Sequence, residues 1–231
     1  MKTTGTTPDL EILYEDNHLL AIQKPPGLLS QEDYSGKPDV LTLCKQYLKI
    51  EYNKPGNAFL GLLHRLDKPV SGVMLLAKTS KAASRISQQI RERSVNKTYL
   101  AVVEGKTPKN GFYSHFLKKN KNSNRVRVVS GSTKRAKEAQ LTFQTVTHFE
   151  RFSVVKIHLL TGRPHQIRVQ FSKEGFPIWG DEYYGKPQNG NIALHAYRLT
   201  ITHPTLNKSL SITANPPESG IWKDFDLTVL D

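Results

Sequence analysis

A chain of 231 residues with 37% hydrophobic and 23% charged residues has the composition of a soluble globular protein, which excludes a fibrous or largely disordered one. It has no apolar run near the roughly 20 residues of a membrane span and no long apolar signal segment, so we expect a cytoplasmic protein without a membrane partner. The single cysteine, Cys44, excludes an internal disulfide, and the net charge of +13 favours a polyanionic partner.

The N-terminal part of the chain predicts a flexible tail over residues 1–9 and then one domain over residues 10–231. Residues 10–16 and 18–24 have the apolar pattern of two strands that are joined by a turn. A helix is expected to begin after Asp39, whose side chain can cap it, and to end before Pro55-Gly56. Cys44 falls on the apolar face of this helix and is expected in the core.

The middle of the chain alternates short apolar segments with a few helical ones. A strand at 72–79 precedes a helix that Ser80 is expected to cap and that runs to about Arg93. Further strands are expected at 96–104, 112–117, 137–148, 151–160, 193–202 and 208–213. A helix-entry signal with Pro164 in the first turn predicts a helix to Lys173, and Ile221, Trp222 and Phe225 are expected to dock. Many strands and few helices predict an α+β fold with a mixed, largely antiparallel central sheet that is flanked by helices.

Residues 118–137 contain eight Lys or Arg and no Asp or Glu. One interpretation is a solvated loop or hairpin. The other is an arm that contacts the phosphates of a nucleic acid, because such contacts position the polymer without reading its sequence.

Asp67 is the only acidic residue between Glu51 and Glu92, and the surrounding cations should favour its ionised form. It can bond to nearby backbone N–H groups or pair with Arg65 or Lys68. Alternatively, a carboxylate held ionised in a basic protein can act as a nucleophile or a base.

Other candidate residues also have a structural interpretation. Tyr99 fits a strand aromatic in a core, and Arg168 fits a solvent-facing helix residue, although it shares a helix face with His165. No histidine is followed four residues later by a second histidine, the spacing of an HExxH zinc site, so a metal site is not expected. Walker A, GxGxxG and GxSxG motifs are absent, which leaves no case for nucleotide hydrolysis, dinucleotide chemistry or serine hydrolysis.

Several motifs occur in a fixed order: HRLD at 64–67 with Ser71-Gly72, KTYLA at 97–101 and TGRPHQIR at 161–168. Segments 180–185 and 194–204 extend the pattern. Together they closely resemble the RluA-type pseudouridine synthases over residues 10 to 215. The resemblance implies the pseudouridine synthase fold and an isomerase that converts uridines of structured RNA, either rRNA or tRNA, without a metal or cofactor. It also implies no obligatory protein partner, and we expect a monomer.

The resemblance also implies roles for individual residues. Asp67 corresponds to the catalytic aspartate, Tyr99 to the aromatic that packs on the target base, and Arg168 to the partner that holds Asp67. Arg65 corresponds to an arginine that occupies the gap left by an extruded base. The full set expected to bind substrate is Arg65, His64, Ile167, Leu194, Lys118, Lys119, Arg125 and Arg127.

The sequence departs from the family pattern in two places. Pro69-Val70 stands where Asp-Thr is common, and Gln170 replaces a frequent histidine. We expect the first to leave the catalytic turn intact and the second to affect packing more than chemistry. The family pattern begins near residue 10, so no S4 RNA-binding domain is expected, and RNA selection would lie in the catalytic domain.

Two functional alternatives remain open at this point. One is an RNA-binding module without activity, and the other is an RNA-cleaving enzyme that uses two of His64, His165 and His195. For the isomerase, Asp67 can attack C1′, add to C6 of the uracil or remove the 2′ proton, since all three routes need an ionised carboxylate.

Overall fold

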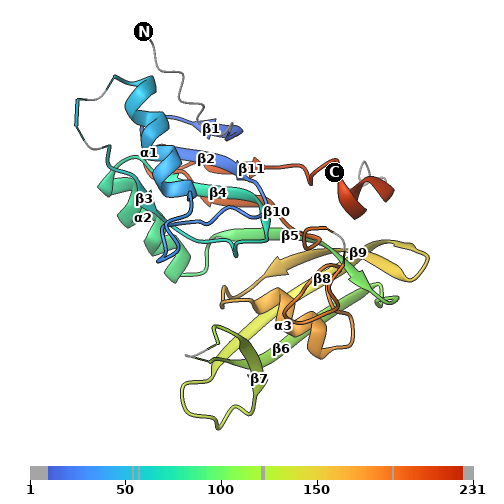
Figure 1. The fold of residues 1–231 in the computed structure, drawn as a ribbon. Coiled ribbons are helices and arrows are strands. Elements are labelled where there is room, and N and C mark those ends of the chain that lie inside the picture. The colour runs from blue at the N-terminus through green and yellow to red at the C-terminus, as the bar shows by residue number, and fades with distance from the viewer. Residues whose placement is uncertain (1–9, 54, 57, 121–122, 189, 226–231) are drawn as a thin grey trace. The chain divides into compact units, whose positions relative to one another are not determined.

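A computed structural model describes residues 10–53, 55–56, 58–120, 123–188 and 190–225 (Figure 1). The chain forms two compact units. The first contains the residues up to Val95 together with Leu199–Ala214, and the second contains Asn96–Arg198 with the residues from Asn215 onward. No helix in the described ranges combines the length and the apolar character that crossing a membrane requires. The predicted tail at 1–9 lies outside the described residues.

The strands of the first unit pair in antiparallel fashion. They are β1 (Ile12–Glu15), β2 (Leu19–Lys24), β3 (Gly61–Leu62) and β4 (Ser71–Ala77), with β2 between β1 and β4. The turn between β1 and β2 is fixed by Asp16, whose Oδ1 accepts hydrogen bonds from the N–H groups of His18 and Leu19, both at 2.7 Å. Strand β10 (Leu194–Thr202) begins in the second unit and ends in the first, where β11 (Ser209–Thr213) pairs with it.

Helices α1 (Val40–Glu51) and α2 (Ser80–Arg91) belong to the first unit. Asp39 caps α1 as predicted, since its side chain accepts a hydrogen bond from the N–H of Thr42. The prediction that Ser80 caps α2 is wrong. Thr79 has the extended backbone that a cap requires, and its hydroxyl accepts from the N–H of Ala82 at 3.2 Å. Ser80 is therefore the first helical residue.

The core of the first unit has two layers because β2 and β4 are buried on both faces. Alternate side chains of each strand point to opposite faces. One set packs with Val40, Cys44 and Leu48 of α1, and the other packs with Ala82 and Ile86 of α2. This explains why both strands read as continuous apolar runs. Burial raises the pKa of the Cys44 thiol to about 12 and confirms its place in the core.

The strands of the second unit form an antiparallel series in the order β5-β9-β8-β6-β7. Their bounds are β5 Asn96–Glu104, β6 Asn110–Lys119, β7 Val126–Val129, β8 Lys137–Phe149 and β9 Phe152–Leu159. A short 3-10 helix, η1 (Gly220–Asp224), carries Ile221 and Trp222. These two residues and Phe225 pack on a cluster that includes Leu100 and Val102, so the predicted docking of this segment is confirmed.

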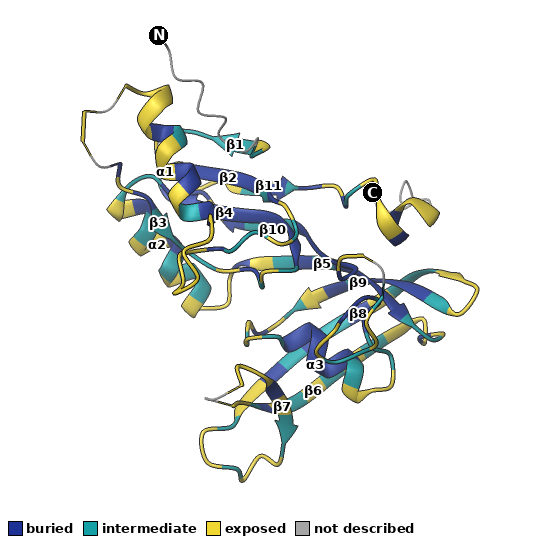
Figure 2. Cartoon of the chain, viewed as in Figure 1, coloured by how far each residue is buried: buried dark blue, intermediate teal, exposed yellow. Residues whose placement is uncertain are grey.

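Helix α3 (Gln166–Lys173) is the most buried helix segment of the second unit, with every residue from Gln166 to Phe171 buried (Figure 2). The prediction that Pro164 lies in its first turn is wrong. His165 is the N-cap with a left-handed backbone, φ 52°, so the helix begins two residues after Pro164. The preceding loop is closed by the Gln166 side chain, whose Oε1 accepts from the Arg163 N–H and the Thr161 hydroxyl.

The prediction of an α+β fold with a largely antiparallel sheet flanked by helices is confirmed. The pairs β1·β2, β2·β4, β3·β4, β5·β9, β6·β7, β6·β8 and β8·β9 are all antiparallel. An isolated parallel bridge joins Leu29 and Asp39. The predicted single domain over residues 10–231 stays a prediction.

Candidate active site

Asp67 lies in a turn that leads into β4, closed by a 3.0 Å hydrogen bond from the Val70 N–H to the Asp67 carbonyl. The preceding residue, Leu66, is held on both backbone groups by Ser30. The Ser30 hydroxyl donates to the Leu66 carbonyl at 2.7 Å and accepts from its N–H at 3.1 Å. The turn forms with Pro69 in place, and Ser30 holds the backbone directly before Asp67.

A buried lysine, Lys24, holds the turn at Lys68. The Lys68 carbonyl accepts hydrogen bonds from the Gly27 N–H at 2.9 Å and from Lys24 Nζ at 3.0 Å. Lys24 Nζ also donates to the Pro25 carbonyl at 2.9 Å, and its side chain is fully buried. Burial lowers the pKa of Lys24 to about 7, although the charge of Asp67 opposes this shift. A neutral amine has two N–H donors, which these two carbonyls satisfy.

Lys24 was not predicted as a functional residue. It is the last residue of the predicted strand at 18–24, directly before Pro25-Pro26-Gly27. Lysines are almost never fully buried unless paired, so no pattern of hydropathy points to one.

The two residues before Leu66 have different environments. Arg65 is exposed next to the turn, as a residue that reaches an RNA strand would need to be. His64 is half-buried, and its Nε2 accepts a 2.9 Å hydrogen bond from the Leu75 N–H of β4. An acceptor nitrogen carries no proton, so this contact anchors His64 to the strand rather than presenting Nε2 to a substrate.

Tyr99 lies on β5, where it is opposite Ile157 of β9. Its neighbours Leu100 and Val102 face one core cluster. Because side chains alternate along a strand, Tyr99 leaves β5 on the face opposite to Leu100 and is only half-buried. The ring is therefore not part of the Leu100 cluster.

Arg168 forms a buried, bidentate ion pair with Asp181. Its Nε and Nη2 donate to the two carboxylate oxygens at 2.8 and 2.7 Å. A guanidinium has five N–H donors, so this pair does not exhaust them. The proposed role of Arg168 toward Asp67 stays a prediction, whereas Asp181 had been noted in the sequence only as part of a motif and without a role.

Asp181 also organises the loop that follows it. Its Oδ1 accepts hydrogen bonds from the N–H groups of Tyr183 and Tyr184 at 2.9 and 3.2 Å. Both rings lie near the Arg168 guanidinium, 5.4 and 5.3 Å from its carbon. The Tyr184 hydroxyl accepts from the Val126 N–H of β7 and lies 2.8 Å from Nδ1 of His165. The loop therefore ties Arg168 to the hairpin that carries the basic segment.

Ile167 and Leu194 are both buried in the second unit, as apolar positions next to a pocket are expected to be.

His195 is fully buried, and its ring centroid is 6.4 Å from that of Trp222. Together with the strand contact of His64, this burial favours structural roles for two of the three histidines from which an RNA-cleaving site would take its pair.

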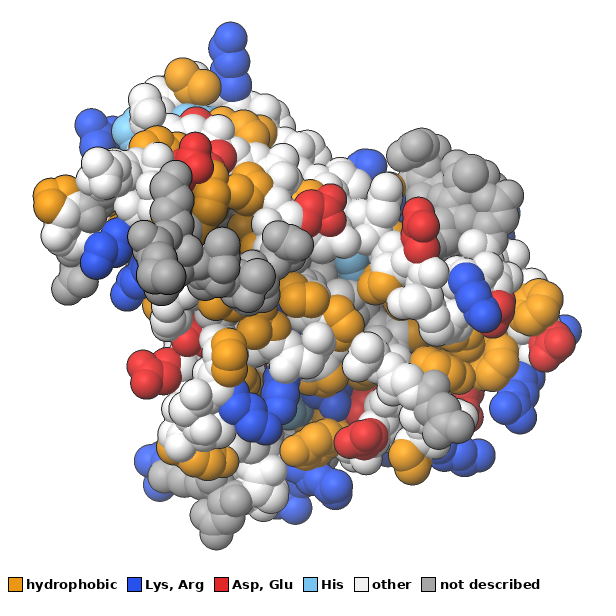
Figure 3. All heavy atoms as spheres, turned by 45° about the horizontal axis from the view of Figure 1, so that its top comes forward, with side chains coloured by type: hydrophobic (Ala, Val, Ile, Leu, Met, Phe, Trp, Pro, Cys, Tyr) orange, Lys and Arg blue, Asp and Glu red, His pale blue; other side chains and the backbone are white. Residues whose placement is uncertain are grey.

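The described basic residues at 118–137 lie on the β6–β7 hairpin and in the loop after it. Lys118 is directly opposite Arg127 on β6 and β7, and Lys119 is opposite Val126. Arg125 is exposed, with its guanidinium carbon 5.3 Å from the Tyr183 ring centroid. Over the face drawn in Figure 3, by contrast, Lys and Arg side chains are interspersed with Asp and Glu. The described residues of the hairpin thus concentrate positive charge on one element.

Comparison with known proteins identifies the family to which the chain is similar. Residues 18–173 match the RNA pseudouridylate synthase family. The chain is 32% identical over 203 residues to the ribosomal large subunit pseudouridine synthase D of Borreliella burgdorferi, covering 83% of this chain and 61% of that protein. It is 31% identical to the uncharacterized RNA pseudouridine synthase MG209 of Mycoplasma genitalium, covering 96% of this chain and 72% of that protein.

A solved structure shows the same fold. The human RNA pseudouridylate synthase domain containing 4 superposes with a TM-score of 0.76 over 90% of this chain and 88% of that one, at 24% identity. Of the two bacterial relatives, the chain covers 61% of the length of one and 72% of the length of the other. Because the family match covers more than half of its length, the chain belongs to the RNA pseudouridylate synthase family.

Proposed function

We propose that this protein is an isomerase that converts uridine to pseudouridine in RNA, with Asp67 as the catalytic carboxylate. The family match supports this most strongly, because residues 18–173 include Asp67, Tyr99 and Arg168. The fixed turn is a second support, since Ser30 and Lys24 restrain the backbone on both sides of Asp67. A catalytic group needs such restraint because small displacements cost large factors in rate.

The reaction breaks the N1–C1′ bond of uridine, turns the uracil and forms a C5–C1′ bond. C5 loses a proton and N1 gains one, so the isomerisation is redox-neutral and needs no cofactor. Asp67 acts in its ionised form by attack on C1′, by addition to C6 or by removal of the 2′ proton. The charge of Asp67 acts on the buried Lys24 amine, where it opposes the lowering of the Lys24 pKa by burial.

The target base must leave its stack before it can react, at a cost of a few kcal/mol. Arg65 is exposed next to the catalytic turn and fills the gap that the base leaves. Tyr99 packs on the extruded uracil, and Ile167 and Leu194 line its pocket. Arg168, oriented by Asp181, supplies N–H donors to the reacting carboxylate.

The proposed substrate is structured RNA, with ribosomal RNA of the large subunit as the first candidate. The relative from Borreliella burgdorferi is named for that substrate, and transfer RNA is the other candidate. Lys118, Lys119, Arg125 and Arg127 contact the phosphates, which gives affinity without base specificity. The protein acts as a monomer, without an obligatory protein partner.

The test is tritium release from RNA that carries uridine labelled at C5, because only isomerisation at C5 exchanges this proton. Ribosomal and transfer RNA are assayed separately, and RNA length is checked on a denaturing gel. We expect release from one of them with unchanged length. Shortened RNA would indicate cleavage, and absence of release from both would leave the RNA-binding module.

A further inference from the structure

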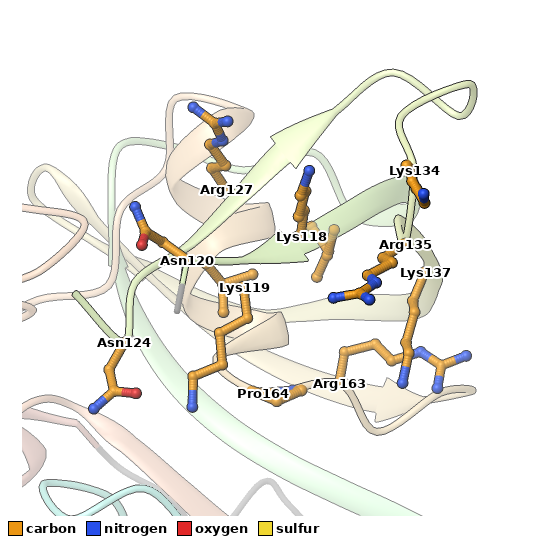
Figure 4. Close-up of a pocket in the computed structure, with 12 residues that line it drawn as sticks. Lys118, Lys119, Asn120, Asn124, Arg127, Lys134, Arg135, Lys137, Arg163 and Pro164 are labelled. Atoms are coloured by element: carbon orange, nitrogen blue, oxygen red, sulfur yellow. The ribbon is translucent and has the colours of Figure 1, made fainter. Parts of the chain in front are cut away.

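A cavity of about 900 Å³ lies in the second unit, between the β6–β7 hairpin, the loop after β7 and the segment that enters α3 (Figure 4). The described residues that line it include seven cations and no acidic or aromatic residue. The cations are Lys118, Lys119, Arg127, Lys134, Arg135, Lys137 and Arg163. Four of them, Lys134, Arg135, Lys137 and Arg163, are outside the set of phosphate contacts proposed above.

The fold holds these cations together against their mutual repulsion. Lys118 and Arg127 are directly opposite on neighbouring strands, an arrangement that destabilises a sheet when the charges are alike. Arg135 has a left-handed backbone, φ 66°, which an arginine rarely adopts. In Figure 4 its guanidinium points toward the space between Lys118 and Arg163. Unfavourable geometry of this kind is typical of functional sites, where a ligand offsets its cost.

The lining of the cavity includes a packed apolar residue, Leu117, and a cation that is held by a hydrogen bond, Arg163. Leu117 is opposite Lys137, so both point to the same face of the sheet, and Leu117 packs there with Val169 of α3. Lys119, two residues from Leu117, also points to this face. Arg163 is held by a 2.9 Å hydrogen bond from its Nε to the Glu138 carbonyl. Charges next to apolar groups are less screened than charges in water, so an anion here is bound more tightly.

We propose that this cavity binds several consecutive phosphates of the substrate RNA at a bend in its backbone. The inference rests on the proposed function, which makes RNA the polyanion. Pockets for small molecules carry only a few polar groups, whereas seven cationic side chains line this cavity. Without an aromatic residue the described lining offers no aromatic ring on which a base can stack, and its seven cations favour phosphates. Seven cations also exceed the number that one phosphate group can contact.

The cavity lies next to the helix that carries Arg168. Arg163 and Pro164 line it, and the chain continues from them directly into α3, which carries Arg168. Tyr184 links α3 and β7 through His165 and Val126. RNA that is fixed at the cavity is therefore fixed on the same packed elements that orient Arg168.

The test compares two triple variants that remove equal charge from the second unit. The cavity variant carries Lys119→Gln, Arg135→Asn and Lys137→Gln, with asparagine chosen because it tolerates a left-handed backbone. The control carries Lys106→Gln, Lys109→Gln and Lys186→Gln at exposed positions outside the cavity lining. Binding of a fluorescent RNA stem–loop with a uridine-rich loop is measured from low to moderate salt, with Asp67→Asn in both proteins.

Each phosphate contact contributes roughly 0.7 to 0.9 to the slope of log affinity against log salt. We expect the cavity variant to lose about 2 from this slope and at least tenfold in affinity at low salt, while the control changes little. Inorganic tripolyphosphate should raise the melting temperature of the control but not of the cavity variant. Equal slopes for the two variants would overturn the proposal, even with a tripolyphosphate effect, because the site would then bind free polyphosphate and not RNA.

A single variant separates charge from backbone strain. Arg135→Gly relieves the left-handed strain and should raise the melting temperature by a few °C, yet lower RNA affinity several-fold. Unchanged RNA affinity would contradict a binding role for Arg135. RNA binding does not require turnover. A protein that binds RNA through the cavity but releases no tritium would therefore contradict the proposed function and leave the RNA-binding role of the cavity standing.

Discussion

Arg168 and Asp181 form a bidentate ion pair in which both side chains are almost completely buried. The pair fixes the orientation of the guanidinium on the second unit before any substrate is present. Asp181 as a partner of Arg168 was not foreseen from the sequence.

Removing the charge of Asp181 should be strongly destabilising. Asp181→Asn removes the charged partner from a buried, bidentate ion pair with Arg168, and breaking a buried pair in this way costs about 3–5 kcal/mol. Glu182→Gln removes an exposed charge next door and should change the free energy of unfolding by less than about 0.5 kcal/mol. Urea unfolding of both variants checks this, and similar stabilities would contradict a structural role for the pair.

The buried Lys24 should make stability depend on pH. Its pKa is about 7 in the folded protein against 10.5 in the unfolded chain, so between these values the unfolded chain binds more protons. Stability should therefore rise with pH across this window relative to Lys24→Met. The full difference is on the order of 5 kcal/mol, since each pKa unit corresponds to about 1.36 kcal/mol.

The measurement is urea unfolding of wild type and Lys24→Met at several pH values from 7 to 10.5. Lys45→Met, at an exposed position of α1, is the control and should follow wild type. A constant difference between wild type and Lys24→Met would show that the lysine is charged in the folded protein throughout.

Ser30 should matter for activity through the catalytic turn. Ser30→Ala leaves the N–H and carbonyl of buried Leu66 without this partner, which costs about 1–3 kcal/mol. The displaced turn should lower kcat for uridine conversion more than it raises KM, because the proposed phosphate contacts lie on the β6–β7 hairpin and not on this turn. Ser35→Ala, in an exposed loop, should leave both constants unchanged. A selective rise in KM would instead place Ser30 in RNA binding.

Much of the fold could be predicted because its signals are local. The apolar runs of β2 and β4, the Asp39 cap and the strong β5 pattern each depend on residues within a few positions. The cap of α2 was assigned one residue late because Thr79 and Ser80 are both good caps. Only the backbone conformation distinguishes them.

The parts that could not be predicted depend on distant contacts. Asp181 meets Arg168 across a loop, and Lys24 meets the Lys68 carbonyl from 44 residues away. Gln170 is fully buried and donates to the Ala139 carbonyl at 3.0 Å, which fits the predicted packing role. The cavity adds Lys134, Arg135, Lys137 and Arg163, which a count of charges along the chain could not place around one space.

The central claim is tested most directly by Asp67→Asn in the tritium-release assay, with Asp33→Asn as an exposed control in the same unit. The amide keeps the shape of the side chain but cannot act as an ionised nucleophile or base. We predict normal folding and RNA binding for both variants, with release abolished in Asp67→Asn and retained in Asp33→Asn. Release at the wild-type rate by Asp67→Asn would contradict the assignment of Asp67 as the catalytic carboxylate.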